Sequence, residues 1–126
     1  MELIIGGAFQ GKRKYGEQHY PGLTWLPAGE ASENQLMQAE GITDLQDYIR
    51  RQIEAEKDVS DLGDKLIQNN PEAVITVQEV GYGVVPVDKT DRIYREAVGR
   101  ICTRLAAHSQ RVVRVVCGIG TVIKNA

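Results

Sequence analysis

A glycine-rich stretch near the beginning of the chain has the residue types of a phosphate-binding loop. It follows the pattern G-x-x-x-x-G-K, with a short apolar run before it and a helical pattern after it. In such loops the glycines let backbone N–H groups surround a phosphate, and the lysine contacts the outer phosphates. The residues predicted to bind nucleotide are Gly6, Gly7, Ala8, Phe9, Gln10, Gly11, Lys12 and Arg13.

The last position of this loop departs from the usual pattern. Arg13 stands where a Ser or Thr hydroxyl normally ligates Mg²⁺. A guanidinium cannot hold a cation, although it can neutralise phosphate charge, so we expect nucleotide binding to depend less on Mg²⁺ than in loops with Ser or Thr. The alternative is a plain glycine-rich turn followed by a solvated basic run, residues 12–14.

Two acidic residues follow predicted strands and are candidates for catalysis or metal binding. Glu79 comes just after the apolar run 73–77, and Asp44 follows the weaker strand candidate 41–43. A carboxylate at the end of a strand beside a phosphate loop can orient a metal ion or act as a base. Glu79 is the stronger candidate and Asp44 its rival; the alternative for Glu79 is a capping or salt-bridging acid.

Apolar runs and helical patterns alternate along the chain. Strands are expected at residues 2–5, 41–43, 73–77 and 111–117, the last of which is expected to be the final strand. Helices are expected at 11–19, 32–40, 45–53 and 90–108. Another helix is expected to have Asp58 as its N-cap, to carry Leu62 and Leu66 on one face, and to end at residues 69–71. Residues 20–30, rich in proline and glycine, are expected to be a loop. This order predicts an α/β fold with a parallel sheet in which 2–5, 73–77 and 112–116 are neighbours. Ligands in such sheets bind beyond the carboxyl ends of the strands.

Length and composition fit one globular domain, residues 1–126. The net charge of −2 implies no general attraction to nucleic acid or to an anionic membrane. The first apolar run, residues 3–5, is too short for a signal peptide or a membrane span. Cys102 and Cys117 form no metal-binding pattern, and we expect both to be reduced and inert in a cytoplasmic protein.

The second half of the chain resembles a known enzyme family. Residues 78–86, Q-E-V-G-Y-G-V-V-P, are similar to the (N/D)-E-V-G-x-G-(I/V)-V-P motif of the adenosylcobinamide kinase / adenosylcobinamide-phosphate guanylyltransferase family. The similarity continues through Arg92, residues 95–100, 104–107 and 112–120. It covers roughly residues 71–124, and residues 6–12 resemble the start of the family's sequence more weakly.

The resemblance implies a fold and a chemistry. The fold is a three-layer P-loop (RecA-like) domain with a mainly parallel sheet, here reduced in size. The activity is cobalamin biosynthesis or salvage: adenosylcobinamide is phosphorylated with ATP or GTP and Mg²⁺, and GMP is then transferred from GTP through a guanylated histidine. Lys12 and Glu79 would be catalytic, and Glu79 and Asp44 would be metal ligands. The loop lining the substrate would contain Val80, Gly81, Tyr82, Gly83 and Pro86. A homo-oligomer, often a trimer, is the implied assembly.

The chain departs from this family between its first helix and its third strand. It is shorter there, where family members carry a histidine with a Trp and a Glu downstream. His19 precedes Trp25 and Glu30 in that order but at another spacing. His19 is therefore a candidate nucleophile, and the alternative is a solvated histidine at a helix end. Two further alternatives to a kinase are a catalytically degenerate relative that binds nucleotide or corrinoid, and a structural partner of a full-length enzyme.

Overall fold

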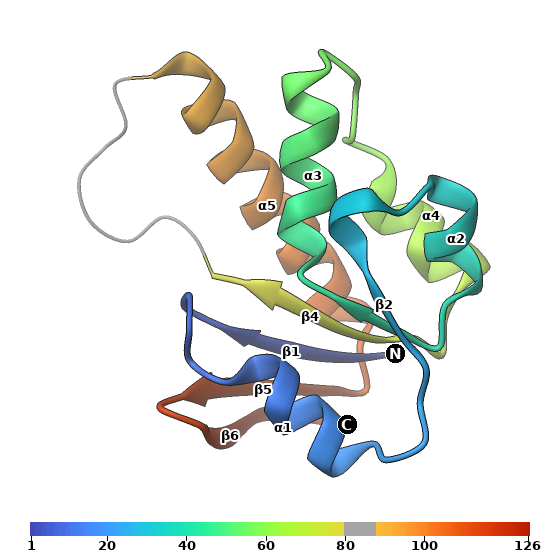
Figure 1. Cartoon of the computed structure of the whole chain (residues 1–126), viewed down its shortest axis with the longest axis vertical. Helices are drawn as coiled ribbons and strands as arrows, with labels where there is room; N and C mark the ends of the chain where they lie inside the picture. Colours follow the sequence, from blue (N-terminus) through green and yellow to red (C-terminus); the bar gives the residue numbers. More distant parts are fainter. Residues whose placement is uncertain (80–87) are drawn as a thin grey trace.

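The computed structural model describes residues 1–79 and 88–126, which form a six-stranded sheet with helices on both faces (Figure 1). The strands are β1 (Glu2–Gly6), β2 (Trp25–Pro27), β3 (Gly41–Thr43), β4 (Val74–Gln78), β5 (Arg111–Val116) and β6 (Ile119–Asn125). The helices are α1 (Lys12–His19), the 3₁₀ helix η1 (Ala28–Glu30), α2 (Glu33–Gln38), α3 (Leu45–Glu54), α4 (Leu62–Asn69) and α5 (Lys89–His108). The strand order is β2-β3-β4-β1-β5-β6. The predicted α/β fold with a mainly parallel sheet is confirmed.

The centre of the sheet is the β4-β1-β5 triplet. Glu2 of β1 lies opposite Val74 of β4 on one side and opposite Arg111 of β5 on the other, and both pairings are parallel. The prediction that these three segments are parallel neighbours is therefore confirmed. Their near-continuous apolar sequences follow from this position, because a central parallel strand is covered on both faces.

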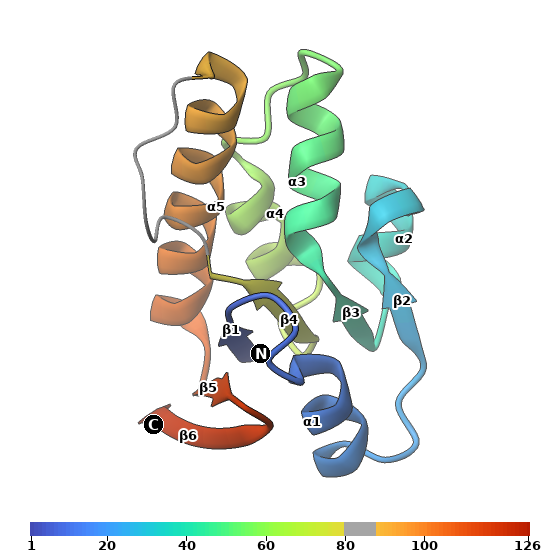
Figure 2. The same ribbon diagram turned by 60° about the vertical axis from the view of Figure 1, so that its left-hand side comes forward.

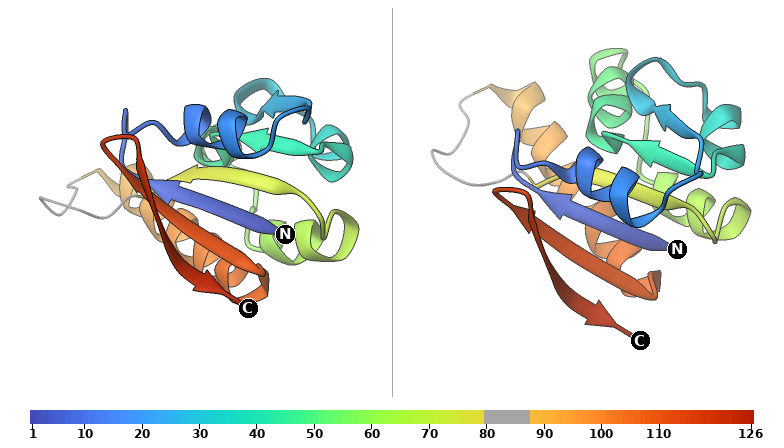
Figure 3. Two further views of the ribbon diagram at one scale, coloured as in Figure 1. Left: turned by 90° about the horizontal axis from the view of Figure 1, so that it is seen from below. Right: turned by 60° about the horizontal axis from the view of Figure 1, so that its bottom comes forward.

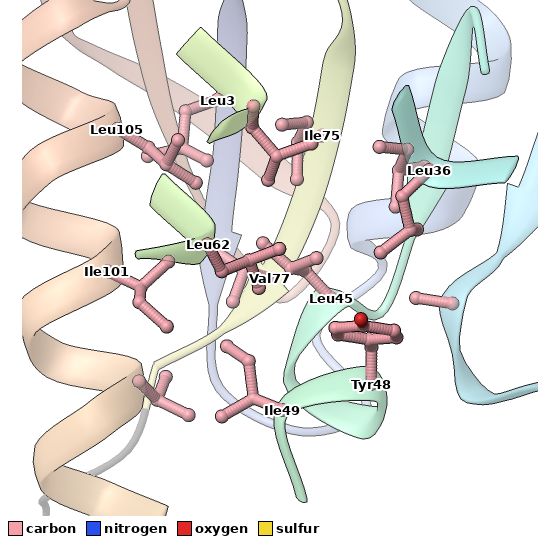
Figure 4. Packing of buried hydrophobic residues seen from close by; sticks show 14 of the residues in the cluster. Leu3, Leu36, Leu45, Tyr48, Ile49, Leu62, Ile75, Val77, Ile101 and Leu105 are labelled. Carbon is pink, nitrogen blue, oxygen red and sulfur yellow. The ribbon is translucent and has the colours of Figure 1, made fainter. Parts of the chain in front are cut away.

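The two faces of the sheet carry unequal layers. Helices α2, α3, α4 and α5 lie on one face and α1 lies on the other, as the rotated views show (Figures 2 and 3). The larger core fills the first face and includes Leu36, Leu45, Ile49, Ile75 and Leu105, all fully buried (Figure 4). The smaller cluster beneath α1 is built from Ile4, Tyr15, Val74, Val113 and Val115. The sheet is thus the middle of three layers, and the layer formed by α1 is the thin one.

Helix α5 has the apolar spacing that the sequence predicts. Tyr94, Val98, Ile101 and Leu105 are buried along one face, three or four residues apart. The Asp88 carboxylate accepts a hydrogen bond from the backbone N–H of Thr90 and caps the helix at its first turn. A long amphipathic helix between β4 and β5 provides the crossover that keeps these two strands parallel.

Three local predictions were wrong. The segment expected to be a loop, residues 20–30, contains β2 and η1. The strand 111–117 is not the final one, because Cys117 and Gly118 turn the chain with φ angles of 52° and 78° into the antiparallel strand β6. Asp58 does not cap α4: its carboxylate accepts from the N–H of Ser60, and the N-cap position belongs to Asp61.

The two cysteines are in different surroundings. Neither is bonded to the other in the structure, and that both are reduced stays a prediction. Burial raises the pKa of Cys102 to about 12, which keeps that thiol protonated and unreactive. Cys117 is exposed in the turn between β5 and β6, so the expected inertness has a structural basis for Cys102 but not for Cys117.

None of the helices within residues 1–79 and 88–126 combines the length and the apolar composition needed to cross a membrane.

Candidate functional site

The carboxyl ends of β1, β3 and β4 meet at one edge of the sheet, where the topology predicts a ligand site. A hollow of about 370 Å³ lies there. Its lining residues come from the glycine loop and from the residues that follow β3 and β4, namely Ala8–Lys14, Asp44, Gln46, Asp47 and Gln78. The structure therefore brings the predicted nucleotide loop and Asp44 together around one open space.

The glycine loop has the backbone geometry that its sequence requires. β1 ends at Gly6, where a Cβ would come within about 2.5 Å of the Val115 carbonyl oxygen. Gly11, at the N-cap of α1, has a φ of 91°, a conformation that favours glycine. The loop between them therefore leads from the central strand directly into the N-terminus of α1, which favours a bound anion through the helix dipole.

Gln10 fastens this loop to the distant turn between β5 and β6. Its backbone carbonyl oxygen accepts a hydrogen bond from the N–H of Gly118 at 2.8 Å. Its side-chain Oε1 accepts from the N–H of Cys117 at 2.6 Å. The sequence predicts Gln10 only as a residue of the nucleotide loop. The partners are more than a hundred residues away, and the antiparallel β6 that creates their turn was not predicted.

Lys12 lies at the entrance to α1 with only 7% of its surface exposed. Its ammonium Nζ donates a hydrogen bond to the Gly7 carbonyl oxygen at 2.7 Å. Burial lowers the pKa of Lys12 below its ordinary value, and the negative charges of Asp44 and Glu79 partly oppose this effect. A desolvated ammonium on the first turn of a helix is a suitable partner for a phosphate.

Arg13 points along the surface of α1. Its Nε forms an ion pair with Glu17 Oε1 at 2.9 Å, and both side chains are exposed. Arg13 still borders the hollow. A guanidinium in this place adds positive charge to the rim and offers no metal ligand.

Glu79 is held by a forked contact with Arg114 of β5. Arg114 Nε donates to Glu79 Oε1 at 2.9 Å and Nη2 donates to Oε2 at 3.3 Å. The Glu79 backbone N–H also donates to the Gly6 carbonyl oxygen at 2.7 Å. This arrangement matches the salt-bridging alternative named for Glu79, and it orients a carboxylate whose charge acts on Lys12. Arg114 was not predicted, because nothing local in the strand sequence R-V-V-R-V-V refers to a partner 35 residues away.

Asp44 occupies a turn between β3 and α3 with a left-handed φ of 57°. Its N–H donates to the buried Thr76 Oγ1 at 2.9 Å, which ties this turn to β4. Gln46 makes a second tie, because its Oε1 accepts from the Gln78 N–H at 2.9 Å while its Nε2 donates to Asp44 Oδ1 at 3.4 Å. Gln46 is buried and was not recognised from the sequence.

Asp47 is a second acid in the same hollow and was also missed. It borders a neighbouring hollow of about 360 Å³ as well, which is lined by Leu26–Ala31, Gln35 and Asp44. The Asp47 side chain is exposed. Its pKa is nevertheless raised, first by local desolvation and then by the negative charge of Asp44, while Arg50 lowers it by a smaller amount. Asp47 therefore stands where two adjoining hollows meet.

The carboxylates fit a metal ion that arrives with a nucleotide better than a preformed metal centre. Across residues 1–79 and 88–126, His, Cys, Asp and Glu side chains do not gather in groups of three that could hold a metal ion. Mg²⁺ in nucleotide sites is usually bound through one or two carboxylates, phosphates and waters. Asp44, in the hollow with Lys12, meets that smaller requirement, while Glu79 is already held by Arg114.

His19 lies at the other end of α1 from Lys12, roughly 10 Å along the helix axis at 1.5 Å per residue. Its ring stacks on Tyr15 with 3.8 Å between centroids, and Nδ1 lies 3.0 Å from the Tyr15 carbonyl oxygen. A carbonyl only accepts, so Nδ1 carries the proton in this contact. His19 is exposed and well oriented, but the structure does not bring it to the hollow.

The predicted substrate loop, Val80, Gly81, Tyr82, Gly83 and Pro86, lies outside the described residues. Its predicted role remains a prediction.

Comparison with known proteins gives the family. Residues 24–123 match the sequence model of the family described as cobinamide kinase / cobinamide phosphate guanyltransferase. The chain belongs to this family. The matched range includes β2 to β5, Asp44, Glu79 and Arg114, and it begins after the glycine loop. The case for the loop therefore depends on its own sequence and geometry.

Two curated members of the cobinamide kinase / cobinamide phosphate guanyltransferase family are similar over a shorter range. The bifunctional adenosylcobalamin biosynthesis protein of Salmonella typhimurium is 45% identical over 51 residues, and that of Escherichia coli is 43% identical over 51 residues. Each match covers 40% of this chain and 28% of the relative. The matched segment thus spans little more than a quarter of the length of these relatives.

Proposed function

We propose that residues 1–126 form one P-loop domain that binds ATP or GTP and transfers its terminal phosphoryl group to a cobinamide-type corrinoid in cobalamin biosynthesis or salvage. The observation that carries this proposal is the desolvated ammonium of Lys12 at the N-terminus of α1, inside a hollow bordered by the glycine loop. Membership of the cobinamide kinase family supports the choice of acceptor.

Each residue has a role in this proposal that follows from its position. Backbone N–H groups of residues 7–13 and Lys12 Nζ bind the β- and γ-phosphates, and Lys12 exchanges its contact with the Gly7 carbonyl for one with phosphate. Asp44 would hold Mg²⁺, which would supply neutralisation of the phosphate charge. Glu79, oriented by Arg114, keeps Lys12 charged and orients the metal or accepts the proton of the attacking hydroxyl. The γ-phosphoryl group moves to that oxygen as the bond to the β-phosphate breaks.

Guanylyl transfer through His19 is a second candidate. The oriented Nδ1 of His19 favours it, because a nucleophilic imidazole needs one ring nitrogen fixed and the other available. The separation of His19 from the hollow weighs against it. If transfer occurs, GTP leaves an acid-labile, base-stable phosphoramidate on His19 that is lost in His19→Ala.

The proposed assembly is a homo-oligomer, for which a trimer is the specific expectation. Two observations support an association of copies: β6 is an outer strand, and Ile119, Val122 and Ile123 on it are exposed. Exposed apolar edge strands in native proteins are normally covered or paired. Light scattering tests this directly, and a mass near 13.9 kDa at working concentrations would contradict it.

The decisive experiment combines labelled nucleotide with a matched pair of lysine variants. Wild type, Lys12→Ala and Lys57→Ala are titrated with ATP, GTP and inorganic tripolyphosphate, with and without Mg²⁺. Loss of the charge-assisted contact should weaken phosphate binding by about 2–3 kcal/mol in Lys12→Ala. Lys57 is exposed and does not border the hollow, so its variant should bind within about twofold of wild type. Equal binding by Lys12→Ala and wild type would show that the loop is only a turn.

Incubations with γ-labelled ATP or GTP, and separately with α-labelled GTP, then distinguish the proposed activities. Transfer of the γ-label to adenosylcobinamide identifies a kinase. Transfer of the α-label to His19 identifies the transferase. Binding without either product would favour the catalytically degenerate alternative. The Arg13→Ser variant sharpens this test, because a restored hydroxyl should increase the dependence of binding on Mg²⁺.

A further inference from the structure

Phe9, at the tip of the glycine loop, is fully exposed to solvent. It is the single phenylalanine of the sequence, and it is the one aromatic side chain among the large exposed apolar residues in the described ranges. Its φ angle of 59° places it in the left-handed region, which a bulky L-residue rarely adopts. An exposed ring on an unfavourable backbone is costly in the free protein, and unusual backbone of this kind clusters at binding sites.

The conformation of Phe9 is fixed by contacts on both sides of it. Gln10 follows Phe9. Its side-chain Oε1 accepts a hydrogen bond from the Cys117 N–H, and its backbone carbonyl oxygen accepts one from the Gly118 N–H. Before Phe9, the carbonyl of Gly7 accepts from Lys12 Nζ. The residues on both sides of Phe9 are therefore held, and Gln10 is held from outside the loop.

The ring also lies beside the place where phosphates are proposed to bind. Phe9 borders the same hollow as Lys12, Asp44 and Gln78. A nucleotide whose phosphates occupy this loop carries a planar base within the same molecule. Aromatic side chains bind such bases by stacking, with an affinity gain that depends little on which base is present.

We propose that Phe9 is a base-stacking residue of this site, and that the ligand it recognises is the planar base of the bound nucleoside triphosphate. The proposal rests on the proposed nucleotide-binding function and adds to it a specificity. Because stacking uses the face of the ring and not hydrogen bonds at the edge of the base, ATP and GTP should gain similarly from Phe9.

The test uses two substitutions of the same residue and one ligand without a base. Phe9→Asn removes the ring but keeps a residue that tolerates the left-handed region, whereas Phe9→Tyr keeps the ring. Affinities of wild type and both variants for ATP, GTP and inorganic tripolyphosphate are measured by calorimetry with the whole chain. Phe9→Asn should bind both nucleotides about 5- to 100-fold more weakly. Its affinity for tripolyphosphate should stay within about twofold, and Phe9→Tyr should resemble wild type throughout.

Several results would overturn the inference. An equal loss of nucleotide and tripolyphosphate affinity in Phe9→Asn would mean that Phe9 acts only on loop shape. Unchanged nucleotide affinity in Phe9→Asn, with binding of adenosylcobinamide weakened instead, would assign the ring to the corrinoid. The proposed function fails separately: if tripolyphosphate binding does not depend on Lys12, the phosphate loop itself is wrong. If binding depends on Lys12 but not on Phe9, only the stacking proposal is lost.

Discussion

At the carboxyl edge of the sheet, three strands are each followed by a non-glycine residue whose backbone is in the left-handed region. These residues are Phe9 after β1, Asp44 after β3 and Cys117 after β5, with φ angles of 59°, 57° and 52°. The opposite situation holds between the sheet and α3 to α5, where fully buried leucine, isoleucine and valine side chains pack in regular elements (Figure 4). At the carboxyl edge the backbone conformation is unfavourable for the residue types present. In the core, apolar residues occupy buried positions in regular helices and strands, which favours stability.

This difference separates residues that stabilise the fold from residues that shape a site. Local features that oppose stability are expected where function requires them, provided that the rest of the molecule compensates. Substitutions in the core should therefore destabilise the protein, whereas some substitutions at the carboxyl edge should stabilise it while removing binding. The following predictions test this contrast.

The largest effect is expected in the core. Leu66 of α4 is fully buried, so Leu66→Ala should lower the free energy of unfolding by about 2–5 kcal/mol through lost burial and the cavity left behind. Urea unfolding measures the change. Gln68→Ala, at an exposed position of the same helix, is the control and should change stability by less than about 0.5 kcal/mol. Similar losses in both variants would contradict the claim that burial of the side chain sets the cost.

The anchor of the glycine loop should have an intermediate effect. Gln10→Ala removes the side-chain contact with the Cys117 N–H and should cost about 1 kcal/mol of stability. It should also weaken tripolyphosphate binding, because the loop is no longer fixed to the β5–β6 turn. Gln18→Ala, at an exposed position of α1, is the matched control and should leave both quantities unchanged.

Lys12 should oppose stability although it is required for binding. Its folded-state pKa is lower than the unfolded value, so the unfolded chain binds more protons between those two values and stability should rise with pH there. Lys12→Met should remove this slope and raise the stability at pH 7 by about 0.5–1 kcal/mol. Unfolding curves at pH 7 and pH 10 compare the two proteins. A destabilised Lys12→Met with an unchanged alkaline slope would show that Lys12 is not desolvated.

The smallest effect concerns two aspartates whose pKa values move in opposite directions. The pKa of Asp47 is raised in the folded state, so this group's contribution to stability should fall as pH rises above the unfolded value of 3.8. The pKa of Asp58 is lowered through hydrogen bonds with Ser60, and its contribution should be lost as pH falls. Stability profiles of Asp47→Asn and Asp58→Asn between pH 3 and 7 should therefore deviate from wild type with opposite slopes. Deviations of the same sign would contradict the assigned environments.

The sequence predicts the middle of the sheet well and its margins poorly. Runs such as residues 73–77 are apolar because both faces are covered, and this signal depends only on local composition. β2 has three residues and ends at Pro27. It is a strand because it pairs with β3, and its own three residues do not predict that pairing. β6 alternates weakly and is largely exposed, so its strand pattern is hidden.

The candidate site divides in the same way. The glycine loop, Lys12 and Asp44 were predicted because a spacing pattern or a position after a strand identifies them. The anchoring role of Gln10 and the residues Arg114 and Gln46 were not predicted, because they depend on partners 32 to 107 residues away. Only the order of the strands brings those partners together, and that order is a property of the folded chain.

The central place of β1 also has a consequence for how the molecule forms. Glu2 pairs with residues 72 and 109 positions later, Val74 and Arg111. Forming such distant contacts requires closing long loops, which slows folding. During synthesis the first strand therefore emerges long before either neighbour, and the glycine loop gains its anchor only when Cys117 and Gly118 have left the ribosome. β1 would thus be made before both of its neighbours and reach its native pairing only after them.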